Sequence, residues 1–187
     1  MNRRELLKFI AAATGTAMIG GNTLLAAGCA RTGGAPDNTF SAQDILLLDE
    51  VAETIVPRTD TPGAKDAEVG ALITVMVNDT YTPDEQEVFH RGLPQIDSAS
   101  QSAFGSDFLQ LTPEQRHTLV SQLDEEARQY NQQQDRPHYF TMIKQLTLFG
   151  FFTSKVGANE VLRYVAIPGH YEGCAPYEKG DRAWATE

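Results

Sequence analysis

The histidines of this sequence are the first candidates for metal or acid-base chemistry, and their spacing argues against a metal site. Two imidazoles on one helix face reach the same metal when they stand three or four residues apart. No two of the four histidines have that spacing; they are His90, His117, His138 and His170. We therefore expect no bound metal, and we expect each histidine to be solvated or to lie in the core.

Other catalytic signatures are also missing from the sequence. It contains no glycine-rich dinucleotide fingerprint, no phosphate loop, no Gly-x-Ser-x-Gly turn and no Cys-x-x-Cys-His haem attachment motif. Acidic pairs such as Glu125–Glu126 fall on a polar helix face and not beside a predicted pocket. The sequence therefore predicts no catalytic residue and no cofactor bound by this chain, and an enzyme in its own right is the least favoured interpretation.

The two cysteines, Cys29 and Cys174, are the remaining reactive residues. If a lipid occupies the thiol of Cys29, Cys174 is an odd cysteine in an oxidising compartment. A leftover thiol in such a compartment indicates intermolecular pairing. We predict that Cys174 forms a disulfide to a larger subunit or packs in the interface with it. The alternative is a buried free thiol.

Residues 1–28 have the layout of an export signal. A basic head with Arg3, Arg4 and Lys8 resembles the twin-arginine pattern, and the apolar stretch that follows is interrupted by Gly and Thr. Twin-arginine export carries cargo that has already folded, often with a cofactor or a partner attached. The alternative is a single transmembrane helix, for which this segment is short and broken by glycines.

The end of this leader resembles a lipobox, in which small residues admit a signal peptidase and the Cys29 thiol receives diacylglycerol. The alternative is cleavage after Ala27 or a little beyond it, which would release a soluble protein. Residues 29–39 show no apolar periodicity and predict a flexible tether. We therefore expect a periplasmic protein that a lipid on Cys29 anchors to a membrane.

Length and charge restrict what the rest of the chain can be. The 187 residues suffice for one domain of ordinary size. A formal net charge of -10 opposes electrostatic binding to phosphate backbones. We therefore expect a single domain with no nucleic-acid partner.

Residues 40–164 predict an all-α fold, a single compact domain of about five to six helices. Three helix starts carry a Ser or Thr cap followed three residues later by Asp, Glu or Gln. The expected helices run from Ser41 to Pro57, from Asp66 to about Asn78, from Thr82 through Ile96, from Thr112 through Ala127, from His138 to Phe152, and from Gly157 through Leu162. Pro94 should kink or split the third of them.

The stretch 138–152 is hydrophobic on nearly all sides, which predicts a helix in the centre of the domain or partly against another subunit. The core is the default interpretation. Residues 165–187 contain prolines, glycines and aromatic residues without a convincing period. A structureless segment of this length is uncommon in a compact domain unless it covers something. The irregular tail is therefore a candidate partner-binding strap.

Four parts of the chain share a pattern with a known family. They are the loop from Ile55 to Ala64, the stretch from Lys144 to Ser154, the pair Gly157-Ala158, and the ending from Leu162 to Trp184. Together they resemble the gluconate 2-dehydrogenase subunit 3 family, the small gamma-type subunit of membrane-associated sugar and sugar-acid dehydrogenases. The resemblance covers roughly residues 40–185.

The resemblance implies a helical, non-catalytic subunit bound to a large FAD-dependent oxidoreductase of the glucose-methanol-choline type, often with a cytochrome c as electron acceptor. The FAD, and a haem c where there is one, belong to partner subunits. The small subunit carries the export signal and takes the folded large subunit with it. No catalytic residue transfers to this chain; the interface candidates are Tyr164, Pro168, Gly169, Cys174, Tyr177 and Trp184. The alternative is a freestanding periplasmic lipoprotein that acts as a binding or scaffold module.

Overall fold

The computed structural model describes residues 39–167, 169–170, 173–174 and 176–185. The predicted signal with Arg3, Arg4 and Lys8, the lipidation site Cys29 and the interface candidate Pro168 lie outside these residues. The described residues contain five α-helices and no β-strand, which confirms the all-α prediction. The α-helices are α2 (Ala42–Ile55), α3 (Val69–Thr80), α4 (Pro83–Phe104), α5 (Pro113–Gln133) and α6 (Tyr139–Thr153). The short 3-10 helices η1 (Ala64–Ala67) and η2 (Phe108–Gln110) lie between them, and the short π-helix η3 (Gly157–Val161) follows α6.

Side-chain caps set the predicted helix starts. The Ser41 hydroxyl accepts a hydrogen bond from the Asp44 backbone N–H at 3.2 Å, and the Asp44 carboxylate accepts one from the Ser41 N–H at 2.8 Å. Thr82 and Thr112 form the same reciprocal capping box at the starts of α4 and α5, each with a proline at the first helical position. These caps satisfy backbone N–H groups that a helix start otherwise leaves without partners.

Two predicted helix boundaries differ from the structure. α3 begins at Val69 and not at Asp66, because η1 precedes it and Glu68 takes a left-handed conformation with φ of 51° between the two. α4 continues through Pro94, so of the two predicted effects, a kink or a split, the split is wrong. Pro94 is exposed, and solvent can therefore hydrate the carbonyl of His90, which loses its helical donor.

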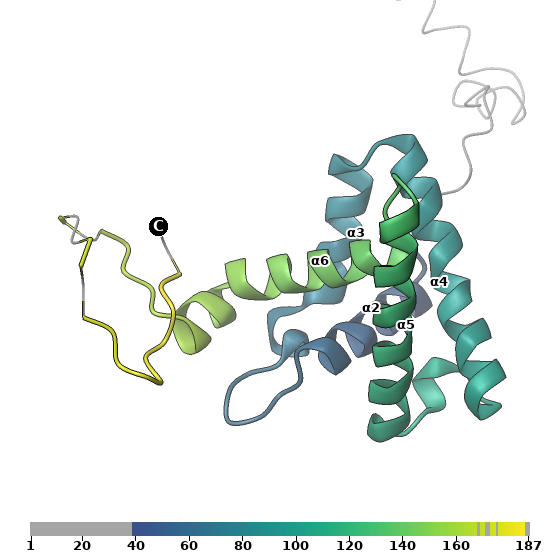
Figure 1. Cartoon of the computed structure of the whole chain (residues 1–187), viewed down its shortest axis with the longest axis horizontal. Coiled ribbons are helices and arrows are strands. Elements are labelled where there is room, and N and C mark those ends of the chain that lie inside the picture. Colours follow the sequence, from purple (N-terminus) through teal and green to yellow (C-terminus); the bar gives the residue numbers. More distant parts are fainter. Residues whose placement is uncertain (1–38, 168, 171–172, 175, 186–187) are drawn as a thin grey trace, which may run out of the picture. The chain divides into compact units, whose positions relative to one another are not determined.

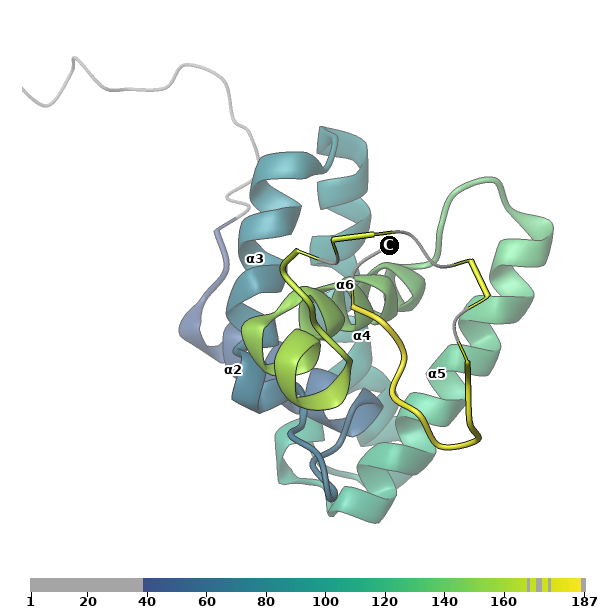
Figure 2. The same cartoon turned by 90° about the vertical axis from the view of Figure 1, so that its left-hand side faces the viewer.

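Helix α6 is the centre of the packing. It contacts α2, α3, α4 and α5, and Figures 1 and 2 show it crossing among them. Its buried side is mostly apolar and includes Phe140, Ile143, Leu146 and Phe151. The prediction of a central helix is confirmed, but Leu148, Phe149 and Phe152 are exposed, so the default core interpretation does not account for this side of the helix.

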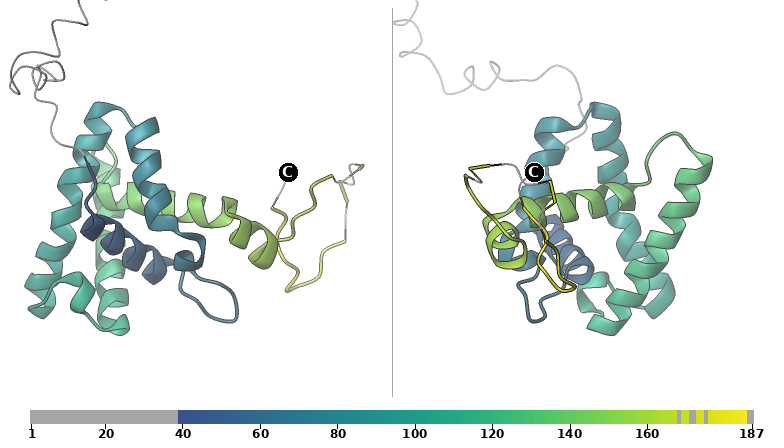
Figure 3. Two further views of the ribbon diagram at one scale, coloured as in Figure 1. Left: turned by 180° about the vertical axis from the view of Figure 1, so that it is seen from behind. Right: turned by 60° about the vertical axis from the view of Figure 1, so that its left-hand side comes forward.

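The segment beyond η3 is irregular, as the sequence predicts. Figure 1 and the left panel of Figure 3 show the C-terminal half of α6 running past α3 and α5, with the tail continuing from that end. The chain from Asn38 onward forms one compact unit, to which both α6 and the tail belong. The candidate partner-binding strap, residues 165–187, therefore belongs to the same compact unit as the helices.

Candidate functional site

Two of the histidines, His138 and His90, make local capping and packing contacts. The His138 ring caps α6, where its Nδ1 accepts a hydrogen bond from the Phe140 N–H at 3.3 Å. The His90 ring packs on Phe40 with centroids 4.4 Å apart. Burial lowers the pKa of both rings, because it disfavours the charged imidazole. Among the residues that the structure describes, no three His, Cys, Asp or Glu side chains are placed to hold a metal ion.

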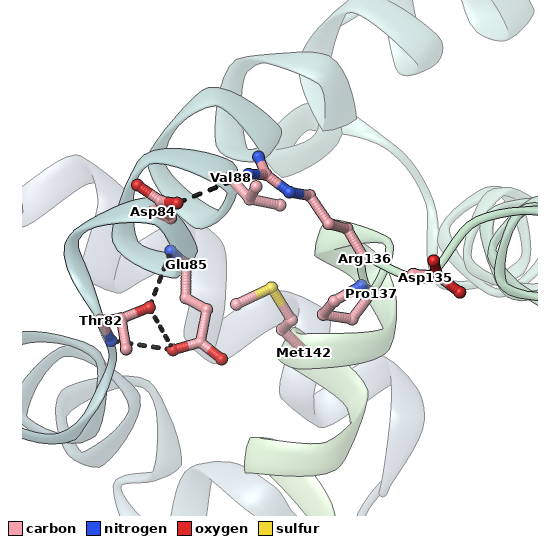
Figure 4. Close-up of a pocket in the computed structure, with 8 residues that line it drawn as sticks. All are labelled: Thr82, Asp84, Glu85, Val88, Asp135, Arg136, Pro137 and Met142. Carbon is pink, nitrogen blue, oxygen red and sulfur yellow. Dashed lines mark hydrogen bonds and ion pairs between the residues drawn. The ribbon is translucent and has the colours of Figure 1, made fainter.

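One pocket of the described residues is too small for a large organic cofactor. It lies between the start of α4 and the start of α6, and its volume is about 170 Å³ (Figure 4). Ligand pockets commonly measure roughly 300–1,000 Å³. Four of its polar side chains make contacts within the chain: Thr82 and Glu85 form the cap of α4, and Arg136 pairs with Asp84 at 3.5 Å. A cavity of this volume does not fit a flavin.

The C-terminal tail closes on itself at its base. The Arg163 N–H donates to the Ala183 carbonyl at 2.8 Å, and the Ala185 N–H donates to the Arg163 carbonyl at 2.9 Å. These two bonds form an isolated parallel bridge between Arg163 and Trp184. The tail is therefore a loop with joined ends and not a free strap.

The Arg163 side chain adds two further contacts at the same point. Its guanidinium lies over the Trp184 ring, 4.5 Å from the centroid, and its Nη2 is 3.8 Å from Asp181 Oδ2. Cation–π and ion-pair contacts of this kind are individually weak when exposed. Together with the bridge, these contacts hold the two ends of the tail loop together. We call the contacts of Arg163 the Arg163 clamp.

The structure describes five of the six predicted interface residues, and all five are exposed. Tyr164, Tyr177 and Trp184 are 48%, 75% and 52% exposed, Gly169 takes a φ of 81° that favours glycine, and Cys174 is a free thiol at the surface. The alternative of a buried thiol is therefore wrong within this chain. The bridge pairs Trp184 with Arg163, the residue directly before Tyr164. Gly169, Cys174 and Tyr177 belong to the loop between these two bridged residues.

Sequence reasoning missed the groups that shape the loop between α2 and η1. The Glu53 carboxylate accepts hydrogen bonds from the backbone N–H groups of Arg58 and Lys65, both at 2.9 Å. A Cβ on Gly63 would lie 2.5 Å from Glu53 Oε1, so a side chain there would displace the carboxylate. Glu53 lies on the polar side of α2 and carries no motif of its own. Only the glycine in the loop gave a signal.

The described residues form a small helical protein of the class that binds through a surface. No group of catalytic side chains converges on a pocket among these residues, and the clamped tail exposes aromatic side chains. A sequence model of the family described as Gluconate 2-dehydrogenase subunit 3 matches residues 42–169. The chain belongs to this family, whose members are accessory subunits of a dehydrogenase complex.

The other comparisons add no relative. Neither the curated proteins nor the solved structures contain a match to this chain. In the part of the chain that the structure describes, no helix has both the length and the apolar character needed to cross a membrane.

Proposed function

We propose that this chain is the non-catalytic small subunit of a periplasmic, membrane-associated dehydrogenase that oxidises a sugar or sugar acid. The catalytic partner is a large FAD-dependent subunit of the glucose-methanol-choline type, with a cytochrome c as a further partner in many such assemblies. This chain binds no cofactor itself. Its tasks are to stabilise the folded large subunit and to escort it through twin-arginine export.

The match of the family to residues 42–169 is the observation that carries the proposal. Two structural features support it. The pocket at α4 and α6 is smaller than common ligand pockets, which agrees with a flavin held by another chain. The clamped tail presents Tyr164, Tyr177 and Trp184, and aromatic residues are enriched where proteins bind one another.

The anchoring and covalent parts of the proposal concern the two cysteines. Cys29 takes the lipid that holds the complex at the membrane. Cys174, whose thiol is exposed on the tail, contacts the large subunit or forms a disulfide with it. Non-reducing electrophoresis of the native complex tests the disulfide: a band at this chain's own mass, unaffected by reductant, contradicts it.

Export is tested by changing the basic head of the signal. Replacing Arg3 and Arg4 with lysine keeps the charge and removes the paired guanidinium groups that twin-arginine export recognises. We expect dehydrogenase activity and the large subunit to stay in the cytoplasm. Arg31→Lys, downstream of the signal, is the matched control and should leave export unchanged. Unchanged periplasmic activity in the double variant would remove the escort role.

A further inference from the structure

The C-terminal half of α6 carries an exposed apolar face. Leu148, Phe149 and Phe152 are 37%, 51% and 38% exposed, and Gln145 is exposed beside them. The four stand at positions i, i+3, i+4 and i+7, which is the spacing of one helix face. We call these four residues the α6 face. The opposite side of α6 is buried in the core, so the helix is apolar both on its buried side and on this exposed side.

Grooves lie on both sides of the α6 face. The groove against α5 has a volume of about 310 Å³, and its walls include Gln145 and Leu148. The groove against α3 has a volume of about 450 Å³, and its walls include Leu72, Val75 and Gly150. Helices α3 and α6 approach closely there, because a Cβ on Gly150 would lie 2.8 Å from Leu72 Cδ2. The α6 face is therefore a ridge between two shallow grooves.

Charge is distributed unevenly between this part of the chain and the rest. Residues 39–138 carry 18 acidic and six basic side chains, whereas residues 139–187 carry five of each. The charged residue within α6 is Lys144, and it pairs with Asp124 of α5 at 2.6 Å. The α6 face thus belongs to the electrically balanced part of an acidic domain. An apolar partner surface without excess charge is complementary to it.

Most of the exposed large hydrophobic side chains of the described residues gather in the same part. Seven of the ten lie on the α6 face, in the tail or at Tyr164 directly before the tail, and an eighth, Val75, lines the groove against α3. The seven are Leu148, Phe149, Phe152, Tyr164, Ile167, Tyr177 and Trp184. Depletion of charge together with enrichment of aromatic residues distinguishes the core of a protein interface from the remaining surface.

We propose that the α6 face and its two grooves dock the large subunit of the dehydrogenase, as a contact surface additional to the clamped tail. The inference rests on the proposed function, which supplies the partner. The chain runs from Phe152 through η3 directly to Arg163, so a single partner surface covers the ridge and then meets the tail. The acidic helices α4 and α5 keep their outer sides in solvent.

Other occupants fit these observations less well. A helix that lies on a membrane combines its apolar face with many lysines and arginines, whereas α6 has Lys144 alone. Anionic headgroups also repel a domain of this acidity. A second copy of this chain would cover the α6 face, but it would leave the large subunit no comparable apolar helix face among the described residues.

Site-specific photo-cross-linking in the native complex tests the docking surface. p-Benzoylphenylalanine is introduced at Phe149 or Phe152, and the full complex is purified through a tag on this chain before irradiation. Leu46 is the matched control position, because it is 54% exposed and belongs to neither the α6 face nor its grooves. We expect cross-links to the stoichiometric large subunit from positions 149 and 152, and none from position 46.

The affinity is tested with the double variant Phe149→Ser and Phe152→Ser, with Leu46→Ser as control. Both phenylalanines are more than one-third exposed, so the helical circular dichroism should not change. We expect binding of the purified large subunit to weaken about 30-fold, as for residues at the centre of an interface. Cross-links only between copies of this chain, or binding unchanged by the double variant, overturn the docking surface and leave the proposed function standing. A preparation without any large subunit overturns both.

Discussion

Replacing Arg163 with alanine should open the base of the tail and weaken binding of the large subunit. The substitution removes the guanidinium from the Trp184 ring and from Asp181 but leaves the two main-chain bonds of the bridge available. The helical domain should stay folded, because Arg163 lies beyond α6 and outside the core. The variant therefore separates closure of the tail from folding of the domain.

The magnitude follows from the contacts at the base of the tail. Closing a loop of roughly 20 residues costs about 3 kcal/mol. The two main-chain hydrogen bonds together stabilise the closed loop by about 2 kcal/mol. The cation–π contact and the ion pair together stabilise it by about 1 to 1.5 kcal/mol more, the strength expected of such exposed contacts. Because these terms nearly balance, loss of the side-chain contacts lowers the closed population roughly four-fold, and the dissociation constant rises by about the same factor.

Two measurements follow the effect. Titration of the purified large subunit gives the dissociation constant, and amide hydrogen exchange at Ala185 reports whether the bridge is closed. Arg128→Ala is the matched control, because Arg128 makes an exposed ion pair with Glu125 on α5 and the change in charge is the same. Equal affinities of the Arg163 and Arg128 variants, with unchanged exchange at Ala185, would refute the reasoning.

Two further predictions concern stability and the tail. Burial lowers the pKa of His138 from 6.5, partly opposed by Glu126, so below pH 6.5 the unfolded chain binds more protons than the folded one. The free energy of unfolding should therefore fall as the pH drops below 6.5. It should fall less in the variant His138→Asn, whose side chain keeps an acceptor for the helix cap. Urea unfolding at pH 7.5 and 5.5 measures the fall, and an equal fall in the variant and in the original protein contradicts the prediction. Deleting residues 165–187 should leave the helical circular dichroism intact and release the large subunit; loss of the helical signal would instead place the tail in the core.

The sequence predicts the helices of this fold well because their signals are local. A capping box such as that of Thr112 joins residues three apart, and the core face of a helix repeats every three or four residues. Both signals survive in the structure almost unchanged. Pro94 shows the limit of a local rule, because the tertiary packing of α4 and the exposure of the proline allow the helix to continue.

The interaction surfaces are less predictable because they depend on distant contacts. Arg163 and Trp184 are far apart in the sequence, and nothing in either neighbourhood indicates that they meet. Helix α6 is apolar on two sides, so its periodicity does not show which side faces the core. The partner role of Cys174 and of the tail follows from the residues themselves, and the other interface candidates follow from the family resemblance, whereas the exposure of Phe149 and Phe152 required the packing of α6 against four other helices.

Purification of this chain from its native membrane tests the central claim most directly. A tag on the chain, mild detergent and size-exclusion chromatography should give an assembly that contains a larger chain in stoichiometric amount. The absorbance spectrum of that assembly should show a flavin that remains with the larger chain after the two are separated. A colourless, monodisperse preparation of this chain alone would contradict the account and favour a freestanding lipoprotein.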